Sequence, residues 1–287
     1  MHVSSHGIIQ QYMLQCISLP IAFLFMQHIV IILVGPQLGE NIGAAARIMS
    51  NFGMDELRIV APRDPWPNEK AVAMAAGGSH VLDKARIYSD IYGAVEDLNF
   101  VCATTANFRD LDKIVLLPRN AMEECYLRSV NSQRIGIMFG RENSGLTNKE
   151  VNLANKLIVI PTNSKNRSLN LAQAIAIVAY ELMMIRMQYR KGMNIDWSMK
   201  QPKAVRNEIE VLYSRVMMML ENGEFFPFPE KKQQMSDKVR NMLLKMELTS
   251  NEVKVLHGIL RVLAHDRTKE AAKKDGEVKK DSGGRDR

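Results

Sequence analysis

The stretch LIVIPTNSKNRSLNLAQAIAIVAYELMMIR, residues 157–186, joins a short apolar run to a long helix through a polar turn. Ser168 and Asn170 both suit the N-cap of this helix, and Gln173 stands three positions after Asn170, as in a cap-and-return pair. Alone, these residues fit a capped core helix, although such a polar helix start also suits a polar ligand. Apolar residues recur in steps of four and three, which predicts one apolar face on the helix: Leu171, Ile175, Val178, Leu182 and Ile185.

Upstream of this helix, apolar runs typical of buried strands alternate with helical segments. This alternation predicts an α/β domain with a mostly parallel sheet, in which ligands bind beyond the carboxyl ends of the strands. The expected strands are 29–34, 57–61, 86–88, 100–105, 135–139 and 157–160, and the expected helices are 41–52, 69–76, 89–98, 121–130 and one that starts at the capping box 147–150. Three strand ends carry polar or Gly-rich turns: 104–107, 140–145 and 161–170.

The composition indicates a folded soluble protein, and the length leaves room for one large and one small domain. Of 287 residues, 46% are hydrophobic and 24% charged, and the net charge of +7 favours a polyanionic partner. Three widely spaced cysteines exclude a disulfide framework and fit a reducing compartment, so we expect a cytoplasmic location. Cysteines and histidines show no metal-ligand spacing, so we expect no metal.

The two ends of the chain differ in character from the α/β part. Residues 13–34 are apolar and uncharged, but Pro20 and the pair Gln27-His28 interrupt them, so we expect neither a membrane span nor a signal peptide. We expect residues 1–25 to be a dispensable extension, and the α/β domain to cover 26–190. A linker over 191–204, an all-helical module over 205–267 and a disordered charged tail over 268–287 follow. Residues 186–245 hold 12 Lys or Arg against 7 Asp or Glu, which suits a nucleic-acid surface or a solvated bundle face.

Two further segments suggest a ligand site. The loop 35–43 lacks both the Gly-x-Gly-x-x-Gly and the P-loop spacing, which argues against an oxidoreductase with a nucleotide cofactor. Just after it, Arg47 is a lone cation among small and apolar neighbours, which suits a phosphate ligand. In 140–147, two glycines permit close backbone approach to a ligand, and Glu142 can accept hydrogen bonds.

Together the three segments resemble the sequence motifs of the SpoU-type RNA ribose 2′-O-methyltransferases of the SPOUT superfamily. The matches are Asn41-x-Gly-x-x-x-Arg47, Ile137-x-Phe-Gly-Arg-Glu-x-x-Gly-Leu146, and Ile160-Pro161 followed by Ser168-Leu-Asn-Leu-Ala172. The resemblance covers residues 29–189. The helical end, with Gly258-Ile-Leu-Arg261, is similar to that of the TrmJ branch, whose members modify nucleotide 32 in the anticodon loop of tRNA.

The resemblance implies a sheet whose last part threads a trefoil knot, S-adenosylmethionine as the cofactor, tRNA as the substrate and a homodimer. In the dimer, Arg47 of one protomer would face the cofactor of the other. Arg167 would reach the cofactor carboxylate or point toward RNA. The cofactor neighbours implied by position are Thr104, Thr105, Ala106, Gly140, Ile160, Arg167, Ser168 and Leu169.

The implied chemistry is attack of a ribose 2′-hydroxyl on the electrophilic methyl group of a sulfonium, which the protein promotes by alignment and by stabilising charge. A guanidinium is an awkward base, so we expect Arg47 to grip a substrate phosphate, with Asn41 as a second RNA contact. The expected catalytic set is Arg47, Glu142, Ser168 and Asn170. Methylation of ribosomal RNA and a non-catalytic RNA-binding role are the alternatives.

Overall fold

The computed structural model describes residues 28–106, 113–165, 167–190, 202–226 and 228–264, and the chain divides into two compact units at residue 200. The predicted extension 1–25, most of the linker and the tail lie outside these residues. The first unit holds a seven-stranded sheet with the order β3-β2-β1-β6-β4-β7-β5, in which every neighbouring pair is parallel. Its strands are β1 (Ile29–Val34), β2 (Glu56–Val60), β3 (Arg86–Tyr88), β4 (Phe100–Thr104), β5 (Ile114–Leu116), β6 (Ile135–Phe139) and β7 (Lys156–Ile158).

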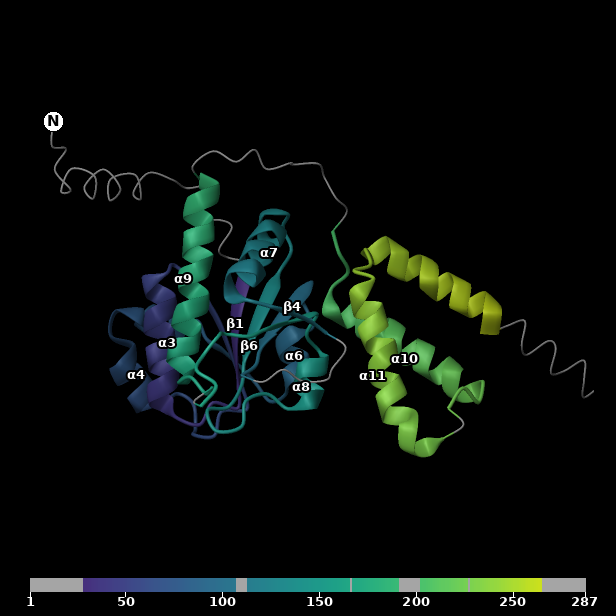
Figure 1. Ribbon diagram of the computed structural model, residues 1–287, viewed down its shortest axis with the longest axis horizontal. Helices are drawn as coiled ribbons and strands as arrows, with labels where there is room; N and C mark the ends of the chain where they lie inside the picture. The colour runs from purple at the N-terminus through teal and green to yellow at the C-terminus, as the bar shows by residue number, and fades with distance from the viewer. Residues whose placement is uncertain (1–27, 107–112, 166, 191–201, 227, 265–287) are drawn as a thin grey trace, which may run out of the picture. The chain divides into compact units, whose positions relative to one another are not determined.

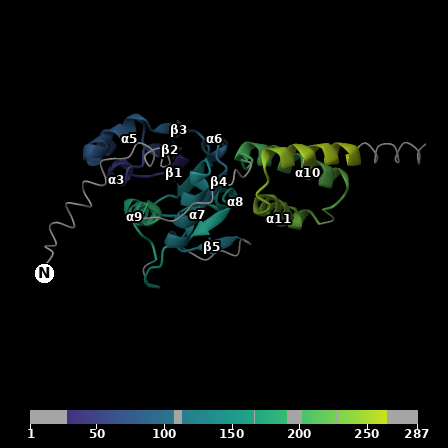
Figure 2. The same ribbon diagram turned by 90° about the horizontal axis from the view of Figure 1, so that it is seen from above.

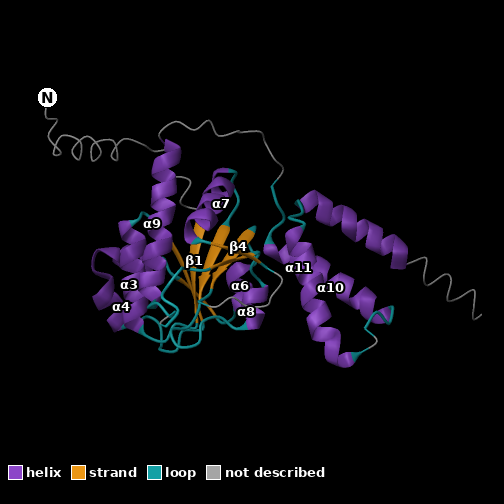
Figure 3. Cartoon of the chain, viewed as in Figure 1, coloured by secondary structure: helices purple, strands orange, loops and turns teal. Residues whose placement is uncertain are grey.

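Helices cover both faces of this sheet (Figures 1, 2 and 3). All six residues of β1 are buried, since successive side chains point into the cores on opposite faces. One face carries α3 (Gly39–Asn51), α4 (Glu69–Ala75), the 3₁₀ turn η2 (Ala76–Gly78), α5 (Ser79–Asp83), α7 (Pro118–Val130) and α9 (Leu171–Arg190), and the other carries α6 (Ile91–Val95) and α8 (Asn148–Asn152). The predicted α/β class is thereby confirmed, and the trefoil knot stays a prediction.

The long helix α9 has the predicted apolar face. Ile175, Val178 and Leu182 are fully buried in the core, and Leu171 and Ile185 are nearly so. The helix is long and apolar enough to span a membrane by composition, but its packing against α3 and α7 accounts for that character. It runs parallel to α3 and beside it, so both helices start at the carboxyl edge of the sheet.

Two elements of the first unit are absent from the sequence-based expectations. The sequence predicts that the helix from residue 69 stops at Gly77-Gly78, and α4 does end at Ala75. In addition, a Cβ on Gly78 would lie 2.7 Å from the carbonyl oxygen of Ala46. This glycine therefore allows close packing on α3, and α5 follows it directly. The edge strand β5 has three residues, and Ile114 in it is half exposed, so it lacks the pattern of a buried strand.

An ion network joins β2, β6 and the end of α6 at the amino edge of the sheet. Arg58 is fully buried and donates to Asp97 at 2.5 Å and to Glu56 at 2.8 Å. Arg134 donates to the same two carboxylates. Burial alone would lower the pKa of Arg58, but its hydrogen bonds to Asp97 and Glu56 outweigh burial and raise that pKa.

The second unit is a small helical module with its own core. It contains α10 (Arg206–Asn222), the 3₁₀ turn η3 (Pro229–Lys231), α11 (Lys232–Lys245) and a helix over 250–264 that starts at a capping box formed by Thr249 and Glu252. Ala204, inside the predicted linker, is buried, and its N–H donates to the carbonyl of Leu248. Ala204 therefore packs with the helical module. The core side chains are Ala204, Ile209, Leu212, Leu243, Leu244, Leu248 and Val253.

Candidate active site

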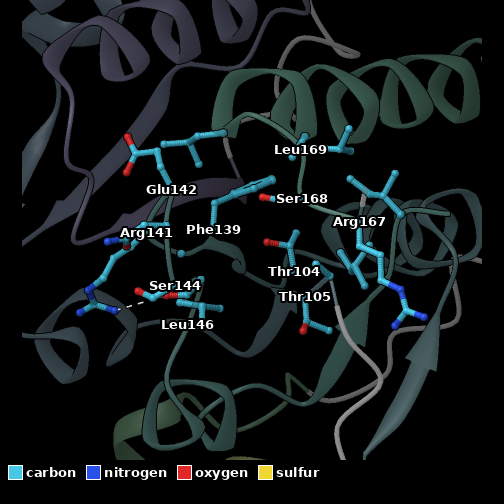
Figure 4. A pocket seen from close by; sticks show the side chains of 18 residues that line it. Thr104, Thr105, Phe139, Arg141, Glu142, Ser144, Leu146, Arg167, Ser168 and Leu169 are labelled. Atoms are coloured by element: carbon cyan, nitrogen blue, oxygen red, sulfur yellow. Dashed lines mark hydrogen bonds between the residues drawn. The ribbon is translucent and has the colours of Figure 1, made fainter. Parts of the chain in front are cut away.

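Three loops at the carboxyl edge of the sheet enclose a cavity of about 250 Å³ (Figure 4). They follow β4, β6 and β7, which are neighbours in the sheet although they lie far apart in the sequence. All eight residues that the resemblance implies as cofactor neighbours line the cavity, together with Glu142; their contact with the cofactor stays a prediction. The lining is Thr104, Thr105, Ala106, Phe139, Gly140, Arg141, Glu142, Asn143, Ser144, Gly145, Leu146, Ile158, Ile160, Arg167, Ser168, Leu169, Leu171 and Ala174.

The loop after β6 folds back on itself. The N–H of Arg141 donates to the carbonyl of Gly145 at 3.2 Å, and the N–H of Gly145 donates back at 2.8 Å. Gly145 has a φ of +66°, a conformation that favours glycine. A Cβ on Gly140 would lie 2.3 Å from the backbone of Gly145, so a side chain there would open the loop. Both glycines are therefore required by this turn.

Glu142 holds this loop against the start of α3 rather than reaching into the cavity. Its carboxylate accepts from the N–H of Gln37 at 2.9 Å and from Nδ2 of Asn41 at 2.8 Å. In Figure 4 the carboxylate points away from the centre of the cavity. Glu142 therefore acts on the site through the positions of the loops.

Asn170 completes the connection as the N-cap of α9. Its Nδ2 donates to Oδ1 of Asn41 at 3.0 Å, and its Oδ1 accepts from the N–H of Ala172 at 2.9 Å. Gln173 accepts from the N–H of Asn170 at 3.3 Å, which confirms the predicted cap-and-return pair. One hydrogen-bonded chain, Glu142–Asn41–Asn170, thus joins the three segments that carry the family resemblance.

Arg141 points the opposite way from Glu142 and fixes the loop to α8. Its guanidinium donates twice to Glu150, at 3.0 Å each, and Glu150 also accepts from the N–H of Thr147 in the α8 capping box. Burial alone would raise the pKa of Glu150, but the hydrogen bonds from Arg141 and Thr147 outweigh burial and hold that pKa below its ordinary value. A Cβ on Gly35 would lie 2.7 Å from Nε of Arg141, so this side chain also packs on the loop after β1.

Three of the expected site residues do not line the cavity: Asn41, Arg47 and Asn170. Asn41 is only 8% exposed, and both its polar atoms are engaged by protein groups. Asn41 therefore connects the loop after β6 to the start of α9, and its contact with RNA stays a prediction. Arg47 is exposed on α3, whereas its neighbours Ala45 and Ala46 are fully buried.

Sequence reasoning did not single out Arg141 and Glu150. Arg141 stands between Gly140 and Glu142, both of which were identified, and Glu150 belongs to the predicted capping box. The sequence feature that could have indicated their ion pair is an arginine in a candidate ligand loop with a carboxylate nine positions later. Their proximity depends on the backward turn of the loop, which no residue spacing defines.

The donor set of the cavity fits S-adenosylmethionine. Ile160, Leu169 and Leu171 offer apolar walls for a nucleoside ring. The hydroxyl of Ser168 points into the cavity in Figure 4 and can meet a polar end of the ligand. The hydroxyl of Thr104 instead donates a hydrogen bond of 3.0 Å to the carbonyl of Met138. Within the described ranges, no group of three or more His, Cys, Asp or Glu could hold a metal ion.

Comparisons with known proteins agree with this architecture. Residues 28–180 match the model of the SpoU rRNA Methylase family. A tRNA (cytidine-2′-O-)-methyltransferase, TrmJ of Methanocaldococcus jannaschii, is 33% identical over 204 residues, 70% of this chain and 85% of that protein. A tRNA (cytidine/uridine-2′-O-)-methyltransferase, TrmJ of Pectobacterium atrosepticum, is 31% identical over 239 residues, 82% of this chain and 96% of that protein. The crystal structure of TrmJ from Z. mobilis ZM4 matches with a TM-score of 0.72 and 39% identity, over 82% of this chain and 98% of that chain.

Proposed function

Because this chain belongs to the SpoU rRNA methylase family and is an S-adenosylmethionine-dependent RNA 2′-O-methyltransferase, we propose that it methylates tRNA at the ribose of nucleotide 32, a cytidine or uridine of the anticodon loop. One observation carries the choice of tRNA. The match to the P. atrosepticum tRNA enzyme extends over 239 residues, more than the 200 of the first unit, so it includes part of the helical module. Nucleotide 32 rests on the resemblance to the TrmJ branch.

The residues around the cavity have separate tasks in this proposal. When bound, S-adenosylmethionine supplies an electrophilic methyl group on a sulfonium sulfur. The hydrogen-bonded chain Glu142–Asn41–Asn170 and the ion pair Arg141–Glu150 keep the cavity loops in place. The ribose 2′-hydroxyl is thereby held in line with the methyl group. Arg47 holds a substrate phosphate and thereby orients the hydroxyl. The hydroxyl oxygen would bond to the methyl carbon as the bond from that carbon to the sulfonium sulfur breaks, and the hydroxyl proton would pass to solvent water.

A homodimer accounts for the position of Arg47, which is exposed and does not line the cavity of its own chain. Beside α3, the helix α9 exposes three large apolar side chains four and three positions apart: Tyr180, Met184 and Met187. Such a stripe on a helix suits packing against another helix. A second copy packed on α3 and α9 would bring Arg47 to the cavity of the partner.

The helical module completes the proposal as a part that binds RNA and supports the dimer. It follows a basic segment and carries its own core, so it can present a separate surface to the tRNA. We place the enzyme in the cytoplasm, where its tRNA substrate and a reducing environment for the buried free thiols of Cys102 and Cys125 are both found.

An acceptor-hydroxyl experiment tests the proposed reaction. The purified protein is given S-adenosylmethionine with a labelled methyl group and three RNAs: a tRNA transcript, the same tRNA with a 2′-deoxyribose at nucleotide 32 only, and a ribosomal RNA fragment. We expect label in the first RNA alone. Label in the deoxy-32 tRNA would contradict nucleotide 32 as the methylated position. Label confined to ribosomal RNA would contradict tRNA as the substrate.

A further inference from the structure

We propose that Arg167 is a binding residue for substrate RNA, which holds a backbone phosphate at the mouth of the cavity, and that it is not a ligand of the cofactor. This inference rests on the proposed function and adds a contact on the substrate side of the same site. It concerns the loop 161–170, which leads from β7 to α9.

The position of Arg167 separates it from its neighbour Ser168. Both residues line the cavity, but the hydroxyl of Ser168 points into it, whereas the guanidinium of Arg167 extends away from its centre (Figure 4). Arg167 is exposed. Its carbonyl accepts from Oγ1 of Thr162 at 3.4 Å, so the backbone of this residue has a partner within the loop.

The charge of Arg167 is not neutralised within the described part of the chain. No described carboxylate forms an ion pair with its guanidinium, and the segment 161–170 contains no Asp or Glu. Lys165, two positions earlier, is exposed as well. The one carboxylate among the lining residues of the cavity, Glu142, already accepts from Asn41, and Glu150 in the neighbouring helix α8 is paired with Arg141. The loop therefore presents net positive charge to whatever approaches the mouth of the cavity.

The chemistry of the substrate supplies the matching group. A ribose 2′-hydroxyl within an RNA chain lies between two phosphodiesters, so a hydroxyl that enters the cavity leaves negative charge at the mouth. A guanidinium can bind such a phosphate through two parallel hydrogen bonds, whereas an ammonium binds it as a point charge. A contact of this kind fixes the register of the RNA without selecting its sequence.

Four proteins test the assignment: the wild type, Arg167→Ala, Arg167→Lys and a control, Arg86→Ala. Arg86 is also exposed, lies on the edge strand β3 and carries the same charge, so the control has the net charge of Arg167→Ala. The measurements are KM for tRNA, kcat, the dissociation constant of S-adenosylmethionine by calorimetry, and the dependence of tRNA binding on salt.

For Arg167→Ala we expect a KM for tRNA about tenfold higher, a salt slope lower by about one, and an unchanged dissociation constant of the cofactor. Arg167→Lys should recover part of the loss, and Arg86→Ala should match the wild type. A weaker cofactor affinity with unchanged KM for tRNA would overturn the inference and make Arg167 a cofactor ligand. Equal behaviour of the two alanine variants would also overturn it. A wild-type protein that leaves tRNA unmethylated would instead refute the proposed function.

Discussion

Nδ2 of Asn170 donates a hydrogen bond of 3.0 Å to Oδ1 of Asn41, although the two residues are 129 positions apart. Nδ2 of Asn41 in turn donates to Glu142. Because each of the three residues stands at the end or the start of a different element, these two bonds hold the loops after β1, β6 and β7 as one assembly. The shape of the cavity therefore depends on side chains that do not point into it.

Replacing Asn41 by Ala should weaken cofactor binding about tenfold or more. The change removes both bonds at once, so that Nδ2 of Asn170 loses its acceptor and the carboxylate of Glu142 keeps only backbone donors. Calorimetric titration with S-adenosylmethionine measures the effect. Asn131→Ala is the control, since Asn131 caps α7 with one exposed hydrogen bond to Leu127. Equal cofactor affinity in the two variants would show that the chain does not shape the cavity.

Replacing Arg47 by Ala should leave the dissociation constant of S-adenosylmethionine within about twofold and lower kcat by about a hundredfold or more, because the residue acts on the substrate alone. Single-turnover methylation and calorimetry separate the two effects. A variant with near wild-type turnover would remove Arg47 from the mechanism.

Mixed dimers decide which cavity Arg47 serves. Gly140→Val should abolish cofactor binding, because its side chain would collide with the backbone of Gly145. Neither Gly140→Val nor Arg47→Ala should then methylate alone. Their mixture should regain activity if Arg47 acts on the cavity of the partner. In a mixed dimer, the intact cavity of the Arg47→Ala protomer then faces the Arg47 of the Gly140→Val protomer. If both variants are folded and dimeric but their mixture shows no methylation, Arg47 acts on the cavity of its own chain.

Replacing Glu150 by Gln should weaken cofactor binding several-fold at a small cost in thermal stability, because it frees Arg141 and with it the loop after β6. Glu124→Gln is a matched control: Glu124 is also partly buried and bound to two cations, Arg128 and Lys156, but it lies on α7 away from the cavity. The expected pattern is lost affinity in the first variant and retained affinity in the second. If both variants lose thermal stability alike and neither loses cofactor affinity, Glu150 only caps its helix and does not shape the cavity.

Much of this architecture could be predicted from local sequence. The strand Ile29–Val34 was correct to the residue because a strand buried on both faces is uniformly apolar. The helix expected over 41–52 is followed by Gly53, whose φ of +69° is the left-handed conformation that commonly ends a helix. The three polar strand ends were brought to one cavity because parallel strands share a carboxyl edge.

What could not be predicted depends on contacts between distant segments. The hydrogen-bond partners of Asn41 could not be predicted because they lie 101 and 129 positions away, and only the fold brings them to its amide. Arg47 follows two buried alanines, yet its own side chain is exposed, because one position rotates a helix by about 100°. The close approach of Gly78 to Ala46 could not be predicted, because such a contact between distant segments leaves no mark in the sequence.

Acid should selectively weaken the ion network around Arg58. Burial alone would raise the pKa of Asp97, but its hydrogen bonds to Arg58 hold that pKa below the ordinary value. A depressed folded pKa stabilises the protein above the unfolded pKa of about 4, and the benefit is lost as the pH falls through the folded value.

Asp97→Asn should therefore lower the free energy of unfolding by about 1–2 kcal/mol at neutral pH, because it leaves the buried Arg58 with one carboxylate fewer while solvent at the partly exposed Asp97 screens the pair. The difference from the wild type should shrink below about pH 4. Urea denaturation between pH 3 and pH 8 measures it. A difference that is independent of pH would show that the charge of Asp97 is not its source.

The most direct test of the proposed function is to map 2′-O-methyl groups in the tRNA and ribosomal RNA of cells with and without the gene. We expect the methyl group at nucleotide 32 of tRNA to disappear on deletion and to return with the wild-type gene, but not with Arg47→Ala. Unchanged methylation at nucleotide 32, with a loss in ribosomal RNA instead, would contradict it.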